Sequence, residues 1–248
     1  MSKPVCATCG GAGWLRLDVD LDDPRFGKSV PCACKAREID QKRYQVLVEH
    51  SNLASLRRMS FDTFYANENQ ATAFARAREY ADNPVGWFVL LGGVGAGKTH
   101  LAAAIGNRRL ELGQPAVFIV VPDLLDHLRS TFAPKSETGF DELFQSVRTA
   151  PLLILDDLGA QNTSSWAAEK LFQILNHRSL ERLCTVITSN QRLHEMHGGD
   201  RLASRIADPD LSTIVAIDGP DLRTMRPDNG APPTAQPPST RPRTPRRP

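Results

Sequence analysis

The sequence has no uncharged apolar run of about 18 residues, the length that a membrane-spanning helix needs. Its first six residues, Met1 to Cys6, lack the apolar core of a secretory signal. We therefore expect no membrane association and a cytoplasmic location. Among the 248 residues, 41% are hydrophobic and 23% are charged, which excludes a fully disordered or collagen-like chain. The length predicts one to two domains.

The net charge of +2 is unevenly distributed along the chain. Residues 224–248 hold five arginines, one acid and eight of the 18 prolines, so this segment carries +4 and the remainder −2. A stretch so rich in proline and so poor in apolar residues predicts a disordered tail. The tail could attract a nucleic acid weakly or serve only as a solubilising terminus. The acidic remainder gives no support to a broad DNA-binding surface.

Four of the five cysteines lie within the first 34 residues, as Cys6-Ala-Thr-Cys9 and Cys32-Ala-Cys34. In a reducing compartment such a cluster indicates a metal site rather than disulfides. Two close pairs can supply the four thiolates of a tetrahedral Zn²⁺ site. We therefore expect a zinc knuckle over residues 1–36; unliganded thiols and a redox Cys-x-x-Cys are the alternatives. Cys184 follows the pattern of a small buried side chain.

Beyond the knuckle, spaced apolar residues predict an amphipathic linker helix over residues 37–60. Five short apolar runs then alternate with helical stretches. The runs are apolar throughout, which is typical of strands buried on both faces of a parallel sheet. The fold prediction is α/β, a five-stranded, doubly wound parallel sheet. The predicted strands are residues 87–91, 116–121, 152–155, 185–188 and 213–217, and the predicted helices are 98–112, 122–129, 140–148 and 164–182.

The strongest signal matches the phosphate-binding pattern G-x-x-x-x-G-K-[ST] at every fixed position, between a predicted strand and a predicted helix. Backbone N–H groups of such a loop surround phosphate oxygens at a helix N-terminus. Lys98 would reach the β- and γ-phosphates of ATP, and the Thr99 hydroxyl would bind Mg²⁺. The matching residues are Gly92, Gly93, Val94, Gly95, Ala96, Gly97, Lys98 and Thr99.

Polar residues follow two further predicted strands, 152–155 and 185–188, and are candidates for roles in ATP hydrolysis. Asp156 and Asp157 follow an apolar strand, as in a Walker B motif, where the first acid would hold Mg²⁺ and the second would act on the attacking water. Asn190 ends the following strand and is a candidate for the residue called sensor 1, which aligns that water. The alternatives are acids that merely end a strand or cap a helix, and an ordinary turn at Asn190.

Arginines after these motifs are candidates for contacts with nucleotide. Arg201 and Arg205 are spaced i and i+4 on one helix face, and one of them could act as an arginine finger toward a neighbouring subunit. We place the role first on Arg205; a solvated basic face is the alternative. Arg223, after the last strand, is a candidate nucleotide contact of the sensor 2 type, or a residue without a site role because the tail follows directly.

Several of these segments resemble the DnaC/DnaI-type replicative helicase loaders and the related IstB-like transposition helpers. The resemblance covers about residues 61–223, and the knuckle looks like the zinc-binding N-terminal region of DnaI-type loaders. The Asp-Asp pair agrees with the loaders, whereas Ser189 stands where threonine is commoner and the Pro/Arg tail is not part of the pattern. The segments are Gly-Gly-Val-Gly-Ala-Gly-Lys-Thr-His-Leu-Ala, Val-Pro-Asp-Leu-Leu-Asp, Leu-Leu-Ile-Leu-Asp-Asp-Leu-Gly-Ala and Trp-Ala-Ala-Glu-Lys-Leu.

The resemblance implies a P-loop NTPase of the AAA+ (ASCE) class without the usual C-terminal helical lid, using ATP and Mg²⁺. It implies self-assembly through AAA+ interfaces, docking of a hexameric DnaB-type replicative helicase on the N-terminal region, and delivery of that helicase to single-stranded DNA. Two other functions stay open. One is an IstB-like helper of a transposase, on which no Cys₄ knuckle is expected. The other is a zinc-stabilised adaptor that binds ATP without hydrolysing it.

Overall fold

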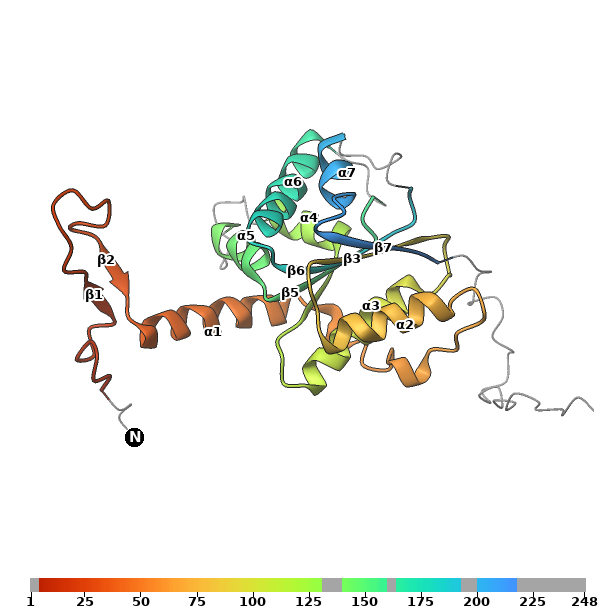
Figure 1. Cartoon of the computed structure of the whole chain (residues 1–248), viewed down its shortest axis with the longest axis horizontal. Helices are drawn as coiled ribbons and strands as arrows, with labels where there is room; N and C mark the ends of the chain where they lie inside the picture. Colours follow the sequence, from red (N-terminus) through yellow and green to blue (C-terminus); the bar gives the residue numbers. More distant parts are fainter. Residues whose placement is uncertain (1–4, 131–139, 160–163, 193–199, 218–248) are drawn as a thin grey trace, which may run out of the picture.

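The computed structural model describes residues 5–130, 140–159, 164–192 and 200–217. A two-stranded antiparallel hairpin, β1 (Trp14–Arg16) and β2 (Ser29–Pro31), stands at one end of the molecule. The long helix α1 (Ala33–Glu49) joins this hairpin to an α/β unit that holds the rest of the described chain (Figure 1). The Arg223 candidate and the predicted tail lie outside the described residues.

All five predicted strands form one parallel sheet, which confirms the predicted fold class. The order across the sheet is β4-β5-β6-β3-β7, so β6 lies between β3 and β5. Each strand except β7, one of the two edge strands, is buried along most of its length, as the continuous apolar runs require. The strands are β3 (Trp87–Gly92), β4 (Val117–Val120), β5 (Leu152–Asp156), β6 (Cys184–Ser189) and β7 (Ser212–Ile217).

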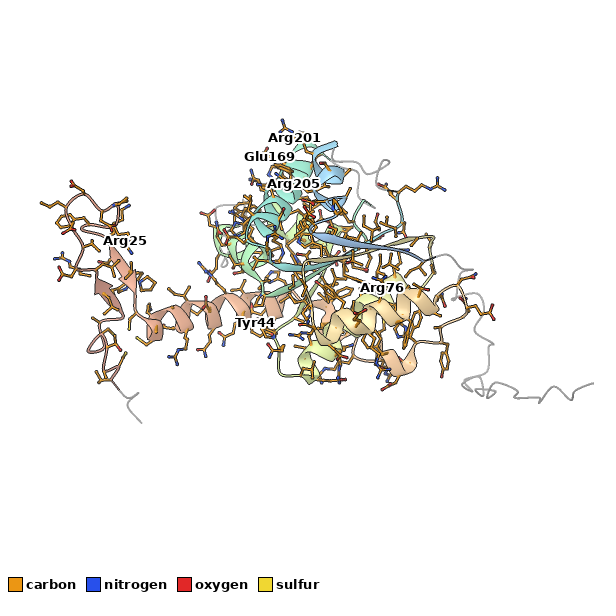
Figure 2. The ribbon with its side chains drawn as sticks, viewed as in Figure 1. Arg25, Tyr44, Arg76, Glu169, Arg201 and Arg205 are labelled. Carbon is orange, nitrogen blue, oxygen red and sulfur yellow. The ribbon has the colours of Figure 1, made fainter. Side chains whose placement is uncertain are left out.

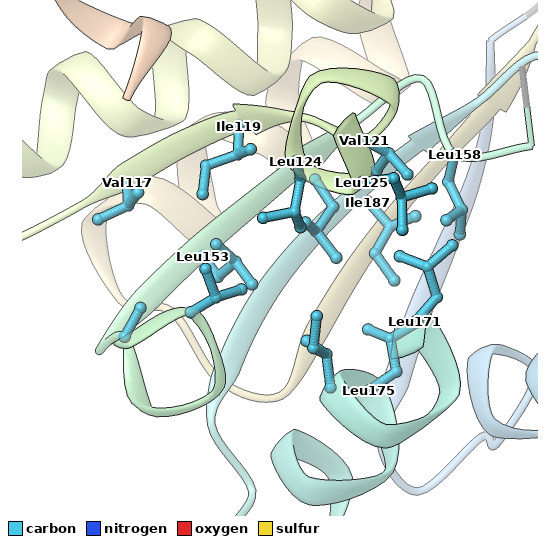
Figure 3. Packing of buried hydrophobic residues seen from close by; sticks show 14 of the residues in the cluster. Val117, Ile119, Val121, Leu124, Leu125, Leu153, Leu158, Leu171, Leu175 and Ile187 are labelled. Atoms are coloured by element: carbon cyan, nitrogen blue, oxygen red, sulfur yellow. The ribbon is translucent and has the colours of Figure 1, made fainter. Parts of the chain in front are cut away.

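Helices cover both faces of this sheet. Residues of α2 and α3 pack in one apolar cluster, and residues of α4 to α7 pack with the opposite strand faces in the other (Figure 1). Figure 3 shows part of the second cluster, where Leu124 and Leu125 lie over Leu153 and Ile187. The helices are α2 (Ala71–Asp82), α3 (Lys98–Glu111), α4 (Val121–Ser130), α5 (Phe140–Thr149), α6 (Ser165–Leu180) and α7 (Asp200–Ile206).

Helix α1 differs in extent from the predicted linker helix of residues 37–60. It begins at Ala33 and ends at Glu49, and two 3₁₀ turns, Asn52–Ala54 and Phe61–Thr63, follow it. The helix ends early because the Ser51 hydroxyl accepts hydrogen bonds from the N–H groups of Leu53, at 3.4 Å, and Phe118 in β4, at 3.1 Å. The chain after α1 is thereby fixed along the edge of the sheet.

The helices of the described residues include none that combines the length and the apolar character that crossing a membrane requires.

Candidate functional site

Three neighbouring strands bring the predicted site residues to one edge of the sheet. The strands β3, β6 and β5 are parallel and end at Gly92, Ser189 and Asp156. Ligands of open α/β sheets bind at this carboxyl edge. The structure therefore places the phosphate loop, the acidic pair and Asn190 side by side, although they are far apart in the sequence.

The loop from Gly92 to Thr99 has a backbone that requires glycine at several of its positions. A Cβ on Gly92 would overlap the carbonyl oxygen of Ile217 in β7. Gly97 precedes α3 in the left-handed region, with φ +98°, which side chains with a Cβ rarely adopt. The loop thus turns sharply into a helix N-terminus, the arrangement that holds phosphate groups in P-loop proteins. These residues fit a nucleoside triphosphate.

The ammonium group of Lys98 lies at the centre of the site. Its Nζ donates hydrogen bonds to the carbonyl oxygens of Gly92 and Gly93, at 2.8 and 2.7 Å, and to Oδ1 of Asn190 at 2.6 Å. Asn190 in turn donates from Nδ2 to Oδ1 of Asp157 at 2.7 Å. The amide therefore bridges the phosphate loop and the acidic pair.

Thr99 and Asp156 form the oxygen-rich part of the site. The Thr99 hydroxyl donates to both carboxylate oxygens of Asp156 at 3.1 Å. Burial raises the pKa of Asp156 above its ordinary value, while hydrogen bonds from Thr188 and Thr99 act in the opposite direction. A hydroxyl and a carboxylate are ligands that Mg²⁺ prefers, so this pair fits the ion.

Thr188, the penultimate residue of β6, is a site residue that sequence reasoning missed. Its hydroxyl donates to Oδ1 of Asp156 at 2.6 Å and accepts from the N–H of Asp157 at 2.9 Å. Asp157 has φ +61°, a left-handed conformation that asparagine and aspartate adopt more readily than other non-glycine residues. In the sequence, Thr188 looks like any β-branched strand residue, and only its position opposite the end of β5 gives it this contact.

Three further hydrogen bonds hold the chain after β5 to the end of β6 and to the residue Gln191 beyond it. The Leu158 N–H donates to the Thr188 carbonyl at 2.9 Å, and the Ser189 hydroxyl donates to the Leu158 carbonyl at 2.6 Å. The Gln191 amide donates to the Gly159 carbonyl at 2.9 Å. The direction in which Asp157 projects is therefore fixed by residues 188–191.

The two arginines of α7 lie apart from this network. Figure 2 shows Arg201 and Arg205 with Glu169 on the side of the molecule formed by α6 and α7. Arg201 is exposed and Arg205 is half-buried. Within the described part of the chain, no hydrogen bond or ion pair joins either arginine to Lys98 or to the acidic pair. The structure of one chain thus does not bring them to its own phosphate loop.

The four clustered cysteines come together at the start of α1. The hairpin closes when the Cys32 N–H donates to the Gly13 carbonyl at 2.8 Å, and all four Sγ atoms then lie within 4.8 Å of one another. A tetrahedral zinc–thiolate site has Zn–S bonds of about 2.3 Å, which places its sulfurs roughly 3.8 Å apart. The Cys6–Cys32 and Cys9–Cys34 sulfur distances are 3.9 and 3.5 Å. The cluster fits Zn²⁺.

Backbone N–H groups further suit these thiols to metal binding. The N–H groups of Cys9 and Thr8 lower the pKa of Cys6 to about 6, and the Gly13 N–H, 3.3 Å from the sulfur, lowers the pKa of Cys9. Cys32 is the N-cap of α1, and Cys34 is its second residue. The neighbouring Cys9 side chain raises the pKa of Cys34 to about 12, so this thiol would lose its proton on binding a metal, because the thiolate is the form that binds metal.

A family model of the IstB-like ATP binding proteins matches residues 39–225. The chain belongs to this family. The matched residues begin inside α1 and include the whole site at the carboxyl edge of the sheet, from the phosphate loop to Asn190. The predicted membership is thereby confirmed.

Individual relatives of this IstB-like protein are replication proteins. The replicative helicase loader DnaC of Escherichia coli (strain K12) is 31% identical over 153 residues, which are 59% of this chain and 62% of the relative. The chain therefore spans about three-fifths of the length of this curated relative. Two solved structures resemble it: DnaI, with 27% identity and a TM-score of 0.56 over 67% of this chain and 92% of that one, and the DnaC helicase loader, with 25% identity and a TM-score of 0.56 over 65% and 97%.

Proposed function

We propose that this IstB-like protein is an ATP-dependent loader that delivers a DnaB-type replicative helicase to single-stranded DNA. The observation that carries the proposal is the pairing, in one chain, of a P-loop site joined to an acidic pair with a separate Cys₄ knuckle at the far end of α1. The similarity to DnaC and DnaI supports a loader over other users of the same fold.

In this proposal the strand-edge residues divide the work of ATP hydrolysis. Lys98 holds the β- and γ-phosphates, and Thr99 with Asp156 holds Mg²⁺, which would neutralise phosphate charge. Asp157 orients the attacking water, and Asn190 keeps its carboxylate in place through the 2.7 Å hydrogen bond. The aspartate is one methylene shorter than the glutamate of most AAA+ motors, so we expect slow hydrolysis by the isolated chain.

The arginine finger in this proposal acts between neighbouring subunits of an assembly. Arg205 is half-buried on α7 and makes no hydrogen bond to the site of its own chain within the described residues. An arginine finger is worth about 10³–10⁵ in rate in other nucleotide hydrolases. Hydrolysis should therefore rise with protein concentration, or on adding single-stranded DNA and helicase, and Arg205→Ala should bind ATP normally but lose this rise.

Mixing two inactive variants tests the finger across subunits. Arg205→Ala keeps its own Asp157, and Asp157→Asn keeps its own Arg205, so a mixed assembly contains interfaces with both groups intact. Partial recovery of activity is expected in the mixture. No recovery in assemblies shown to be mixed would move the role to Arg201 or to a partner protein.

Docking of the helicase is proposed on the knuckle because it exposes several large hydrophobic side chains. Trp14, Leu21 and Phe26 are 48%, 79% and 51% exposed, respectively. Trp14→Ser combined with Phe26→Ser should abolish co-purification with a DnaB-type helicase. Val85→Ser is the matched control, since Val85 is 73% exposed but lies in the ATPase unit. Equal retention of helicase by both variants would refute the docking role.

A transposase helper is the second candidate function, favoured by the IstB-like family itself. It predicts ATP-dependent assembly on duplex DNA and no association with a replicative helicase. Binding assays with helicase, duplex DNA and single-stranded DNA, each with and without ATP, separate the two. ATP binding without turnover in every mixture would instead indicate an adaptor.

A further inference from the structure

One carbonyl group of the phosphate loop has a partner outside every motif found in the sequence. The loop presents N–H groups to phosphate, so its buried carbonyl groups need hydrogen-bond donors elsewhere in the protein. Ala96 is fully buried, and its carbonyl oxygen accepts a hydrogen bond from Nε2 of Gln70 at 2.8 Å. Gln70 itself is 0% exposed, although it is a polar residue.

This hydrogen bond fixes more than the carbonyl group. The Ala96 carbonyl and the Gly97 N–H belong to one peptide plane, which is trans, and in a trans peptide the two groups point in opposite directions. Holding the carbonyl toward Gln70 therefore holds the Gly97 N–H toward the other side of the loop. Gly97 is also the left-handed residue at which the loop becomes α3, and as a glycine it has no Cβ to restrict its rotation.

The Gln70 amide is itself held in one orientation. Its Oε1 accepts from the N–H of Asn67 at 3.2 Å, while the Gln70 N–H donates to Oδ1 of Asn67 at 3.1 Å. Because Oε1 already accepts the hydrogen bond from Asn67, the amide is oriented with Nε2 toward the Ala96 carbonyl. Gln70 is also the N-cap of α2, which anchors its backbone.

A second buried amide fastens the same part of the chain to α3. Asn107 donates from Nδ2 to the carbonyl oxygens of Leu56 and Met59, both at 3.0 Å. Asn107 is 8% exposed. The hydrogen bonds found for its side chain all go to the segment that precedes Gln70, and none goes to the phosphate loop. Asn107 is therefore a suitable control residue for Gln70.

We propose that Gln70 is a positioning residue for nucleotide binding, which sets the direction of the Gly97 N–H by holding the carbonyl group of Ala96. The proposal rests on the proposed ATP-binding role of the loop. Because the N–H groups of a P-loop surround the α- and β-phosphates, the effect should be the same for ATP and ADP. Gln70 acts through the backbone and need not touch the nucleotide.

The test measures the affinities of purified full-length variants for ATP·Mg and ADP·Mg by titration calorimetry. Gln70→Met keeps the length of the side chain but removes the donor, and Gln70→Asn keeps the amide but is one methylene too short. We expect each to bind ATP and ADP about tenfold more weakly than wild type, by the same factor for both nucleotides. Asn107→Leu, which loses two hydrogen bonds of a buried amide, should stay within twofold.

The outcomes separate this proposal from the function on which it rests. A wild-type protein that binds neither nucleotide refutes the ATP-binding function itself. Tight binding by wild type, with Gln70→Met and Gln70→Asn within twofold of it, overturns the role of Gln70 alone. Equal weakening in Asn107→Leu would also overturn it, since the effect would then be general loss of structure. If Gln70→Met does not fold, Gln70→Asn decides.

Discussion

Replacing Thr188 with valine removes a hydroxyl at almost constant volume and tests the arrangement of the acidic pair. The carboxylate of Asp156 loses a 2.6 Å donor, and the N–H of Asp157 loses a 2.9 Å acceptor. A hydrogen bond to a charged group contributes about 1.5–3 kcal/mol, and an unpaired buried donor costs about 1–3 kcal/mol. Because such effects are not additive, we expect Thr188→Val to lower the free energy of unfolding at pH 7 by about 3 kcal/mol.

The pH dependence of this loss follows from Asp156. Burial raises the pKa of its carboxyl group in the folded state above the ordinary value of 3.8, and the Thr188 hydroxyl opposes that rise. A carboxyl group whose pKa is higher in the folded state than in the unfolded state stabilises the fold fully at pH values below its unfolded-state pKa. That stabilisation is lost as the pH rises through its folded-state pKa. Removing the hydroxyl raises the folded pKa further. The difference in stability between variant and wild type should therefore be largest at pH 7 and shrink as the pH is lowered toward 4.

Thr185→Val is the matched control, because Thr185 lies in the same strand and its hydroxyl accepts from Arg178 at 2.9 Å, away from any carboxylate. Urea unfolding at several pH values and the Mg²⁺ dependence of ATP hydrolysis are the measurements. We expect only Thr188→Val to show the pH-dependent difference and a several-fold higher Mg²⁺ requirement. Identical behaviour of the two variants would refute the reasoning.

Three further substitutions test other parts of the molecule. Lys98→Ala should weaken ATP·Mg binding at least tenfold, because phosphate loses a charged donor, and a calorimetric affinity within twofold of wild type would contradict the P-loop assignment. Cys6→Ser with Cys9→Ser should release zinc and unfold the knuckle while the ATPase unit keeps its melting temperature; metal analysis of wild type giving well under one zinc per chain would argue against the site. Arg178→Met should lower the free energy of unfolding by about 4 kcal/mol, since the fully buried guanidinium donates to the carbonyl groups of four residues; a denaturation midpoint like that of wild type would show those carbonyls to be satisfied otherwise.

The five strands of the parallel sheet and helices α3 to α6 could be predicted because the signals are local, whereas α2 and the two hairpin strands were not among the predictions. Continuous apolar runs predicted all five strands, and the glycine-rich motif located the turn between β3 and α3. The Cys-x-x-Cys and Cys-x-Cys pairs predicted a cluster that the hairpin does assemble. The extent of α1 was not predictable in this way, since its end depends on a hydrogen bond from Phe118 in β4 to Ser51.

The amino-acid sequence by itself determined which residues could bind phosphate, Mg²⁺ and zinc, because those chemistries depend on residue type and short spacing. Only the tertiary structure decided how the residues are held. The parallel sheet places β6 between β3 and β5, and this order lets Asn190 link Lys98 to Asp157. The contacts of Thr188 and Gln70 likewise join segments far apart in the chain, and no local pattern distinguishes such residues from ordinary strand or helix-capping residues.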